Sequence, residues 1–311
     1  MRILFTGGGT GGHFFPIIAI VRAIKDVAEE ERILDTQFFY IGPKTQGDDA
    51  LEKEGVVVAH ILAGKIRRYS YLENIADFFK IAIGILQSFW KLFILMPDVV
   101  FSKGGYGSFP TLFVSRIYRL PVIIHESDII PGRVNQWSAK FAKRIAVAFE
   151  RAAEYFPKEK TAVTGNPVRK RLFGGNPSEA KEEFKAFSGK PVILVLGGSQ
   201  GSETLNNTIL AVLKELVSRY EVIHQTGTKK FEDTMLQAKI ILNNRFDDYH
   251  VYPFLNEGEM RNAYLLADII VSRAGAGAIF EIAAWGKPAI LVPLKDAAQD
   301  HQLENAYEYG K

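Results

Sequence analysis

The sequence predicts an α/β protein built from two doubly wound domains with parallel sheets. Its 311 residues are more than one ordinary hydrophobic core organises. A hydrophobic content of 47% is that of a packed globular protein rather than a disordered chain. Along the whole chain, short apolar runs lead into a glycine or a turn and then into a helical pattern, which is typical of alternating strands and helices.

Six apolar runs predict strands in the first half, and five more do so in the second half. They are continuous in Val, Ile, Leu and Phe rather than alternating with polar residues, which indicates parallel strands covered on both faces. The runs are RILFTGG, TQFFYIG, VVVAHIL, VVFSKGG, VIIHES and RIAVAFE, followed by PVILVLGGS, YEVIHQTG, YHVYPFL, DIIVSRAG and PAILVP.

The segment TGNPVRKRLFGGNPSEAKEEF has the proline, glycine and asparagine density of a connection between domains. We therefore expect a first domain at residues 1–163, a linker at 164–189 with a hinge near Gly165–Pro167, and a second domain at 190–311. Two such sheets, with the loops at their carboxyl ends facing each other, would form a cleft for a ligand.

Composition narrows the possible chemistry. The chain has no cysteine, which excludes disulfides, thiolate metal sites and a cysteine nucleophile. The N-terminal residues lack the apolar core and cleavage site of a signal peptide. Residues 64–144 carry twelve Lys or Arg against five Asp or Glu, so this half favours an anionic partner such as a nucleic acid, a phosphate or an acidic membrane surface.

Residues 71–97, YLENIADFFKIAIGILQSFWKLFILMP, are almost wholly apolar. Lys80 and Lys91 divide the stretch into runs of about ten, short of the roughly 20 residues that cross a bilayer. Composition leaves two interpretations open: a buried core helix, or a helix lying on a membrane.

Aromatic and basic residues near this stretch suit an anionic bilayer surface. They flank it and recur in residues 133–144: Lys65, Arg67, Arg68, Trp137, Lys140, Phe141, Lys143 and Arg144. A nucleic-acid partner is least favoured, because these basic residues accompany an apolar stretch rather than a stacking platform.

The opening stretch MRILFTGGGTGGHFFP contains G-x-G-x-x-G at Gly7, Gly9 and Gly12. A dinucleotide site also needs an acidic residue at the end of the second strand, but that strand ends on Gly42 and Pro43. No G-K-[ST] follows the glycines, which excludes a Walker A loop. The sequence therefore argues against both nucleotide motifs.

Glycines at a turn from strand to helix still let backbone N–H groups approach a ligand oxygen, at a helix start that favours negative charge. His13 stands between this loop and the helix. A lone histidine is usually structural or exposed, but imidazole titrates near neutrality and suits a general base. The glycine setting favours the functional interpretation for His13.

The second half repeats the arrangement twice, in VLGGSQGS and in SRAGAGAIFE. Small residues from Gly275 to Ala278 would leave a helix start open to a phosphate, with Arg273 nearby to neutralise its charge. Glu281 could accept two ribose hydroxyls, although a tightly packed helix start with Glu281 at the surface is the plainer alternative. Several such turns suggest a large ligand with more than one phosphate.

The motifs GGTGGH, GGYGS, HES, GNPVR, GGSQGS and HQLENA, in this order and spacing, resemble the MurG family along almost the full chain. The resemblance implies a GT-B glycosyltransferase, in which the first domain binds the acceptor and the second binds the sugar nucleotide. It implies inverting transfer of N-acetylglucosamine from UDP-N-acetylglucosamine to the 4-hydroxyl of the muramoyl sugar of lipid I, which gives lipid II for peptidoglycan synthesis. It also implies a peripheral protein on the cytoplasmic face of the bacterial plasma membrane, and so favours the membrane interpretation of residues 71–97.

Matched position by position, the resemblance implies a catalytic role for His13 and acceptor contacts from Gly104, Gly105 and Tyr106. The expected donor-binding residues, Arg273 included, are Thr10, Gly11, Gly12, Asp128, Arg169, Ser199, Leu255, Arg273, Ala276, Gly277, Ala278, Ile279, Phe280, Glu281 and Gln302.

Individual donor roles follow from the same match. Arg169 and Ser199 would reach the nucleotide and its phosphates, and Leu255 would meet uracil through its backbone. The stretch Ala276–Glu281 would hold the diphosphate and ribose, and Gln302 would recognise sugar hydroxyls.

The chain departs from the family pattern in three places. It has HESD where many members have HEQN, so Asp128 would contact the sugar only as an acceptor. Its PFLNEGEM is longer than the related FIDDM. Members continue with further helices after HQLENA, so we expect that the chain ending at Lys311 is a truncated fragment.

We expect neither a metal nor a cofactor, because no Asp-x-Asp pattern suitable for a metal–diphosphate bridge stands out. Helix-start N–H groups would instead stabilise the departing UDP. Two alternatives stay open: another GT-B enzyme acting on a UDP-sugar, such as a glycolipid synthase or a sugar-nucleotide epimerase, and a non-catalytic subunit that binds a nucleotide sugar at the membrane.

Overall fold

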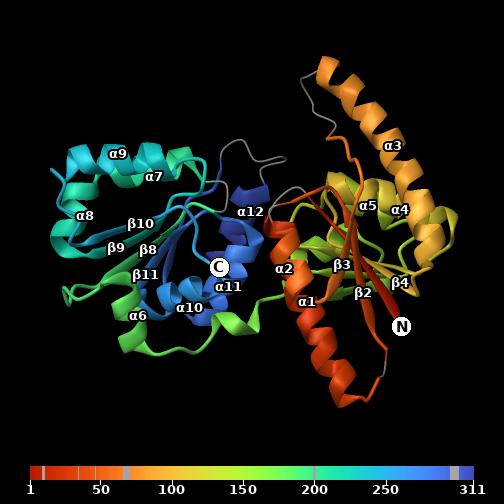
Figure 1. Ribbon diagram of the computed structural model, residues 1–311, viewed down its shortest axis with the longest axis horizontal. Helices are drawn as coiled ribbons and strands as arrows, with labels where there is room; N and C mark the ends of the chain where they lie inside the picture. The colour runs from red at the N-terminus through yellow and green to blue at the C-terminus, as the bar shows by residue number, and fades with distance from the viewer. Residues whose placement is uncertain (9–10, 34, 46, 66–70, 199–200, 295–300) are drawn as a thin grey trace. The chain divides into compact units, whose positions relative to one another are not determined.

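The computed structural model describes residues 1–311 except 9–10, 34, 46, 66–70, 199–200 and 295–300, and for residues 11–13 and 71–73 it describes the backbone. The chain divides into two compact units, Met1–Val168 and Arg169–Lys311, each built of helices around a parallel sheet (Figure 1).

The first unit contains a seven-stranded sheet in the order β3-β2-β1-β4-β5-β6-β7, and every neighbouring pair is parallel. Its strands are β1 (Arg2–Thr6), β2 (Gln37–Gly42), β3 (Val56–His60), β4 (Val99–Ser102), β5 (Val122–Glu126), β6 (Arg144–Val147) and β7 (Thr161–Val163). The first six are confirmed predictions. No apolar run predicts β7, because it is a three-residue edge strand whose Ala162 and Val163 are exposed.

Helices cover the sheet of the first unit. They are α1 (Gly11–Glu30), α2 (Asp48–Lys53), α3 (Tyr71–Leu95), α4 (Phe109–Ile117) and α5 (Arg133–Ser138), with 3-10 turns η1 (Tyr106–Ser108), η2 (Glu150–Tyr155) and η3 (Lys158–Lys160). Ile17 and Val21 of α1 form one core cluster with Phe5 and Phe38 of the sheet. This cluster holds α1 against β1 and β2, and so positions the start of the helix.

The second unit contains a parallel five-stranded sheet in the order β10-β9-β8-β11-β12. Its strands are β8 (Val192–Leu196), β9 (Glu221–Gln225), β10 (Tyr249–Tyr252), β11 (Ile269–Ser272) and β12 (Ala289–Leu291), all of them predicted. Leu194 and Leu196 belong to one buried cluster, whereas Ile193 and Val195 belong to another. Both faces of the sheet are therefore covered, as its continuous apolar runs predict.

The helices of the second unit are η4 (Lys170–Leu172), α6 (Pro177–Phe184), α7 (Glu203–Ala211), α8 (Leu213–Arg219), α9 (Phe231–Ile241), α10 (Glu257–Leu266), α11 (Ala276–Trp285) and α12 (His301–Tyr309). The first two fall within the expected linker at 164–189. Leu172 and Phe184 are buried in the core cluster of this unit, and α6 packs against α10. Most of that segment is thus part of the second unit, because its apolar side chains have a core to join.

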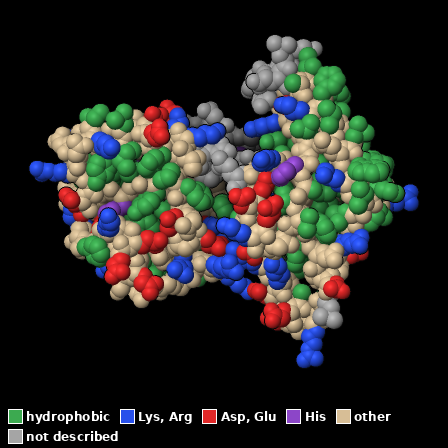
Figure 2. Space-filling view, viewed as in Figure 1, with side chains coloured by type: hydrophobic (Ala, Val, Ile, Leu, Met, Phe, Trp, Pro, Cys, Tyr) green, Lys and Arg blue, Asp and Glu red, His purple; other side chains and the backbone are tan. Residues whose placement is uncertain are grey.

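Helix α3 exposes most of its large apolar side chains, and Leu92 is buried together with small or polar residues. Asp77, Gly84, Ser88 and Leu92 recur on one face and are buried, whereas Leu86 on the other side is 71% exposed. Figure 2 shows hydrophobic side chains gathered along this helix. The buried-core interpretation of residues 71–97 is therefore wrong.

The length of the apolar part of α3 also differs from the expectation. Residues Asn74–Leu95 span 22 residues, and the most apolar window of 18 residues among them has a mean hydropathy of 1.6, so the helix is long and apolar enough by length and composition to cross a bilayer. The two lysines do not bring it below that limit. A soluble core helix can pass the same test, but such a helix is mostly buried, and 17% of the most apolar window is buried here.

The buried face of α3 predicts the effect of one substitution. A Cβ at Gly84 would overlap the carbonyl oxygen of Leu62. Gly84→Ala should therefore destabilise the first unit by about 1–3 kcal/mol, although alanine alone favours a helix by about 1 kcal/mol. Gly258→Ala in α10, where the new Cβ meets only Asn256 at an ordinary distance, is the matched control. Thermal unfolding measures both, and an unchanged melting temperature for Gly84→Ala would contradict the close packing.

Candidate active site

Each sheet has a point where its strand order reverses, between β1 and β4 in the first unit and between β8 and β11 in the second. Open parallel sheets bind ligands outside the carboxyl ends of their strands at such a point. The predicted residues Gly104–Tyr106 follow β4, and Arg273 and Ala276–Glu281 follow β11. The predicted loops thus lie at the reversal point of their own sheet.

Three loops meet closely at this edge of the first unit. Tyr40 of β2 donates a hydrogen bond from its hydroxyl to the carbonyl of Gly7, at 2.7 Å. A Cβ at Gly8 would lie 3.0 Å from the ring of Pro43, and one at Gly107 would lie 2.7 Å from it. The glycines therefore allow the segments after β1, β2 and β4 to pack backbone against backbone.

The proposed catalytic segment is only partly described. Thr10 and Ser199 lie outside the described residues, and so does the side chain of His13. Gly11, Gly12 and His13 form the first turn of α1. The next residue, Phe14, is buried in the core and anchors that turn. The role of His13 as general base stays a prediction.

The predicted acceptor loop needs its glycines. Gly104 has a φ of 73° and Gly105 one of 81°, in the left-handed region that other residues rarely adopt. A Cβ at Gly104 would also lie 2.6 Å from the side-chain amide of Asn135 in α5. Tyr106 follows as a half-buried residue at the start of η1. The loop is thus shaped by its backbone, with α5 packed directly beneath it.

Glu126, at the end of β5, is a buried carboxylate that accepts four hydrogen bonds. The backbone N–H groups of Ser127 and Asp128 donate to Oε1 at 2.8 and 3.1 Å. The N–H of Gly132 and the amide of Asn135 donate to Oε2 at 3.0 and 2.9 Å. Burial, and then the charge of Asp128, raise the pKa of Glu126, and the hydrogen bonds from Asn135, Asp128 and Gly132 act against that rise. Glu126 thereby fixes the loop that carries the predicted sugar contact Asp128.

Lys103, directly after β4, is 1% exposed and donates to three side chains: His125 Nδ1 at 2.7 Å, Ser127 Oγ at 2.5 Å and Asn166 Oδ1 at 3.1 Å. The Nε2 of His125 lies 2.9 Å from the carbonyl of Gly165, which can only accept, so Nε2 carries the proton. Burial, and then the charge of Lys103, lower the pKa of His125 to about 3. The ring is neutral with both nitrogens engaged, so it cannot act as the base.

In the second unit, α11 begins without a side-chain cap at Gly275. Among the described residues, a Cβ added at Gly275 or Gly277 would meet no atom within 4 Å beyond its chain neighbours and its own helix backbone. Among the described residues, the guanidinium of Arg273 has no hydrogen-bond or ion-pair partner. The helix start therefore has open space, N–H groups without a side-chain cap and an adjacent cation, which together suit a phosphate. The phosphate-binding role of this helix start stays a prediction.

Arg169 and Glu281 bind each other. The Nη2 and Nε atoms of Arg169 donate to Oε1 of Glu281 at 2.8 and 3.2 Å, and the hydroxyl of Tyr264 donates to Oε2 at 3.2 Å. Burial raises the pKa of Tyr264, so its hydroxyl keeps the proton that it donates. Glu257 lies 3.9 Å from Arg169. Arg169 thus orients Glu281, and the expected contact of Arg169 with the nucleotide stays a prediction.

Leu255 and Gln302, which are also expected to bind the donor, each make a hydrogen bond within the protein. The side chain of Leu255 is buried, and its N–H donates to Oε1 of Gln225 at 3.3 Å. Oε1 of Gln302 accepts from the N–H of Leu294 at 3.1 Å. Asn305, which the sequence does not single out, is fully buried and donates to the carbonyl of Ala274 at 3.3 Å. Helix α12 therefore supports the loop before α11.

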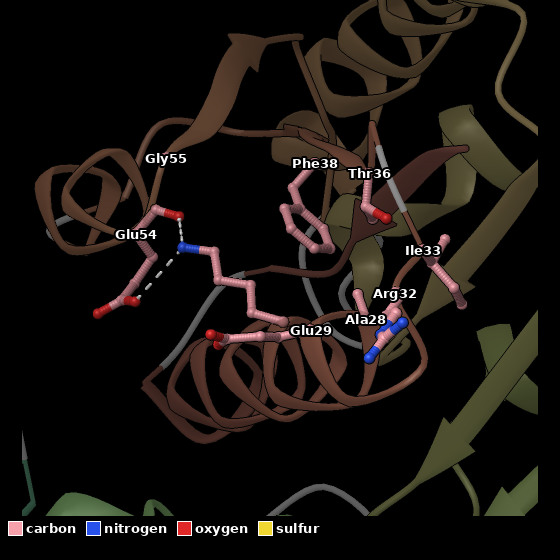
Figure 3. Close-up of a pocket in the computed structure, with 9 residues that line it drawn as sticks. Ala28, Glu29, Arg32, Ile33, Thr36, Phe38, Glu54 and Gly55 are labelled. Atoms are coloured by element: carbon pink, nitrogen blue, oxygen red, sulfur yellow. Dashed lines mark hydrogen bonds and ion pairs between the residues drawn. The ribbon is translucent and has the colours of Figure 1, made fainter.

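A pocket of about 720 Å³ lies elsewhere in the first unit (Figure 3). The second half of α1, the start of β2 around Phe38 and the turn at Glu54 and Gly55 line it, and Lys25 donates to the carbonyl of Glu54 at 2.5 Å. These are the amino ends of β2 and β3, opposite the edge where the predicted loops lie. This pocket is not the candidate active site.

Comparison with known families matches residues 3–147 to the glycosyltransferase family 28 N-terminal domain and residues 192–311 to its C-terminal domain. A Bacillus cereus protein, UDP-N-acetylglucosamine--N-acetylmuramyl-(pentapeptide) pyrophosphoryl-undecaprenol N-acetylglucosamine transferase 2, is 37% identical over 317 residues, covering 100% of this chain and 84% of the relative. A Treponema denticola transferase of the same descriptive name is 37% identical over 328 residues, covering 99% and 81%.

The chain belongs to the MurG family. The crystal structure of Acinetobacter baumannii MurG aligns with a TM-score of 0.68 and 27% identity, covering 98% of this chain and 82% of that one. A UDP-GlcNAc 2-epimerase from Neisseria meningitidis, solved with UDP-GlcNAc bound, aligns with a TM-score of 0.68 at 15% identity, covering 99% and 85%, and this likeness shows the fold alone. The predictions of the MurG family and of a GT-B fold are confirmed.

Among the described residues, no group of three or more His, Asp or Glu side chains is placed to hold a metal ion. The MurG family assignment does not by itself test the contacts expected of individual residues. In each unit, the described residues that the sequence predicts for the site lie at the carboxyl edge of the sheet. Lys103, Glu126 and Asn305 hold the loops at these edges.

Proposed function

We propose that the chain transfers N-acetylglucosamine, with inversion, from UDP-N-acetylglucosamine to the 4-hydroxyl of the muramoyl sugar of lipid I. The product is lipid II, the precursor for peptidoglycan synthesis. The observation that carries this proposal is the likeness, over the full length of the chain, to transferases named for this sugar and this acceptor.

In this reaction the acceptor oxygen forms a bond to the anomeric carbon while the bond from that carbon to the diphosphate breaks. The hydroxyl proton passes to His13, and the electron pair of the broken bond leaves with UDP. A histidine at the start of α1 suits this task because imidazole titrates near neutral pH. The reaction must also stabilise the negative charge that develops on UDP as it leaves.

The start of α11 is suited to stabilise the negative charge on UDP. Its first N–H groups are uncapped, the space at Gly275 and Gly277 is open, and Arg273 adds a positive charge. Fixed dipoles of this kind stabilise a developing charge without reorganising during the reaction. Glu281, oriented by Arg169, would accept the ribose hydroxyls, and Gln302 would contact the sugar.

We also propose that the first unit attaches to the cytoplasmic face of the plasma membrane through α3 and residues 133–144. Phe78 and Trp90 of α3 are each 66% exposed. Trp137 belongs to an aromatic cluster with Phe109, Phe113 and Phe141, at ring distances between 5.0 and 6.4 Å. Exposed basic residues lie in the same segment: Lys140, Lys143 and Arg144. Lys65 is exposed as well, whereas Arg67 and Arg68 lie outside the described residues.

Replacing His13 tests the chemistry. His13→Ala should lower turnover by about 10²-fold or more, because the attacking hydroxyl loses its base, with nearly unchanged affinity for UDP-N-acetylglucosamine. Steady-state transfer to lipid I and donor titration measure the two effects. His60→Ala, which removes the exposed histidine that ends β3, is the matched control. Turnover equal to that of the parent protein would remove His13 from the chemistry.

Replacing Glu281 tests the donor site. Glu281→Ala removes an acceptor of two charge-assisted hydrogen bonds, so affinity for UDP should fall roughly tenfold to a hundredfold. Calorimetric titration with UDP measures this, and Glu232→Ala on α9, an exposed carboxylate, serves as the control. Unaltered UDP affinity would contradict the ribose role.

Removing two exposed aromatic side chains tests membrane attachment. The double variant Phe78→Ser with Trp90→Ser should bind vesicles containing anionic lipid at least about tenfold more weakly, because less apolar area enters the interface. The control replaces Leu236 and Ile240, also exposed and apolar but on α9, with serine. Sedimentation with vesicles measures both. Equal losses in the two double variants would argue against a specific role for α3.

A further inference from the structure

Lys103 joins three loops at the carboxyl edge of the first sheet. It follows β4, its partner His125 lies in β5 next to the last residue, and Asn166 follows β7. Its own backbone N–H donates to the carbonyl of Thr6 at the end of β1. One side chain therefore connects three segments: the loop that contains Gly104–Tyr106, the loop that contains Asp128, and the segment Gly165–Pro167.

The three contacts match the chemistry of an ammonium ion. Nζ carries three protons when charged, and three acceptors lie within 3.1 Å of it. Two of these acceptors cannot donate in return: Nδ1 of His125, because Nε2 holds the ring proton, and Oδ1 of Asn166. Only the Ser127 hydroxyl can reverse its hydrogen bond if Nζ loses a proton.

Burial and the nearby carboxylates have opposite effects on the pKa of Lys103. Burial lowers the pKa of Lys103 to about 7, while the carboxylates of Glu126 and Asp128 act in the opposite direction. His125 is neutral, as its proton positions require. Buried ions are often less stabilising than well-packed apolar groups of similar size, so stability alone does not account for a charge at this place.

We propose that Lys103, as an ammonium ion, is the positioning residue that ties the loop after β4 to those after β5 and β7, so that the loop after β4 keeps the arrangement that binds the acceptor. This inference rests on the proposed glycosyl transfer for its assay, but not for its geometry. Lys103 acts through the loops and does not touch the substrate, because its side chain is 1% exposed and its three protons are engaged. Loss of the charge would force the Ser127 hydroxyl to reverse and would weaken the hydrogen bonds to His125 and Asn166, which are no longer charge-assisted, and so would loosen the loops.

The first experiment removes the ammonium and keeps the length of the side chain. Lys103→Met should lower kcat/KM for lipid I roughly tenfold to a hundredfold, because the acceptor loops are misplaced. Affinity for UDP should stay within about twofold, since the α11 site lies in the other unit. Lys160→Met is the matched control: Lys160 also donates from a partly buried position, to the carbonyl of Ala139, but it precedes β7 at the opposite edge of the sheet. Parent-like acceptor kinetics in Lys103→Met would overturn the proposal.

The second experiment varies pH, which a merely structural contact would not register. The parent kcat/KM for lipid I should fall as pH rises above about 7, because the ammonium is then lost; protonation of the base His13 reduces activity on the acid side instead. Asn166→Asp places a carboxylate beside Nζ, which stabilises the ammonium. The fall of kcat/KM at alkaline pH, the alkaline limb of the pH profile, should therefore move up by about one pH unit or more. An alkaline limb unchanged in Asn166→Asp, or still present in Lys103→Met, would overturn the proposal.

A third readout does not depend on activity. The imidazole nitrogen resonances of His125 should report a neutral ring protonated at Nε2, with an Nδ1 signal that shifts as Lys103 titrates and that changes in Lys103→Met. An Nδ1 signal that is insensitive to both would contradict the contact. If the parent protein transfers no sugar but shows this coupling, the proposed function fails while the Lys103 contact stands.

Discussion

All neighbouring strands in both sheets are parallel, and the functional geometry of the molecule depends on this alignment. Because parallel strands end at the same edge, loops far apart in the sequence are brought within hydrogen-bond distance of one another. Lys103 and Asn166 are 63 residues apart, and Arg169 and Glu281 are 112 apart. An antiparallel sheet would send alternate loops to opposite edges and separate these groups.

Each unit holds its loops with buried polar groups rather than with apolar packing. Glu126 and Lys103 are both almost wholly buried, and taking a charge out of water costs several kcal/mol unless its hydrogen bonds are remade. Here the four donors around Glu126 and the three acceptors around Lys103 remake them. Such a network holds well in one geometry only, which is the property that a substrate-binding edge needs. In the second unit, Asn305 and the pair of Arg169 with Glu281 do the same for the start of α11.

The same physical reasoning explains the unusual helix α3. Its inner face has Gly84 and Ser88, which let the helix approach the chain near Leu62 closely. Close packing around Gly84 leaves little room on that face, so most large apolar side chains lie on the other side and the exposed surface becomes the apolar one. A soluble helix has the reverse pattern. The exposed apolar face is accounted for if the helix lies against lipid, which links the local packing to the proposed site of action.

The amino-acid sequence by itself determined the alternation of strands and helices, eleven of the twelve strands, and the glycine turns that lead into α1 and α11. Apolar runs and glycines act locally, and local patterns can be recognised without knowing the neighbours. It also determined the MurG family, through motifs spread along the chain. Only the tertiary structure decided that α3 is exposed, that residues 169–189 join the second unit, and that Arg169 binds Glu281. It alone also showed the contacts of Lys103, His125 and Asn166. These outcomes depend on pairs of residues distant in sequence, whose meeting is set by strand order and packing rather than by any pattern near either residue.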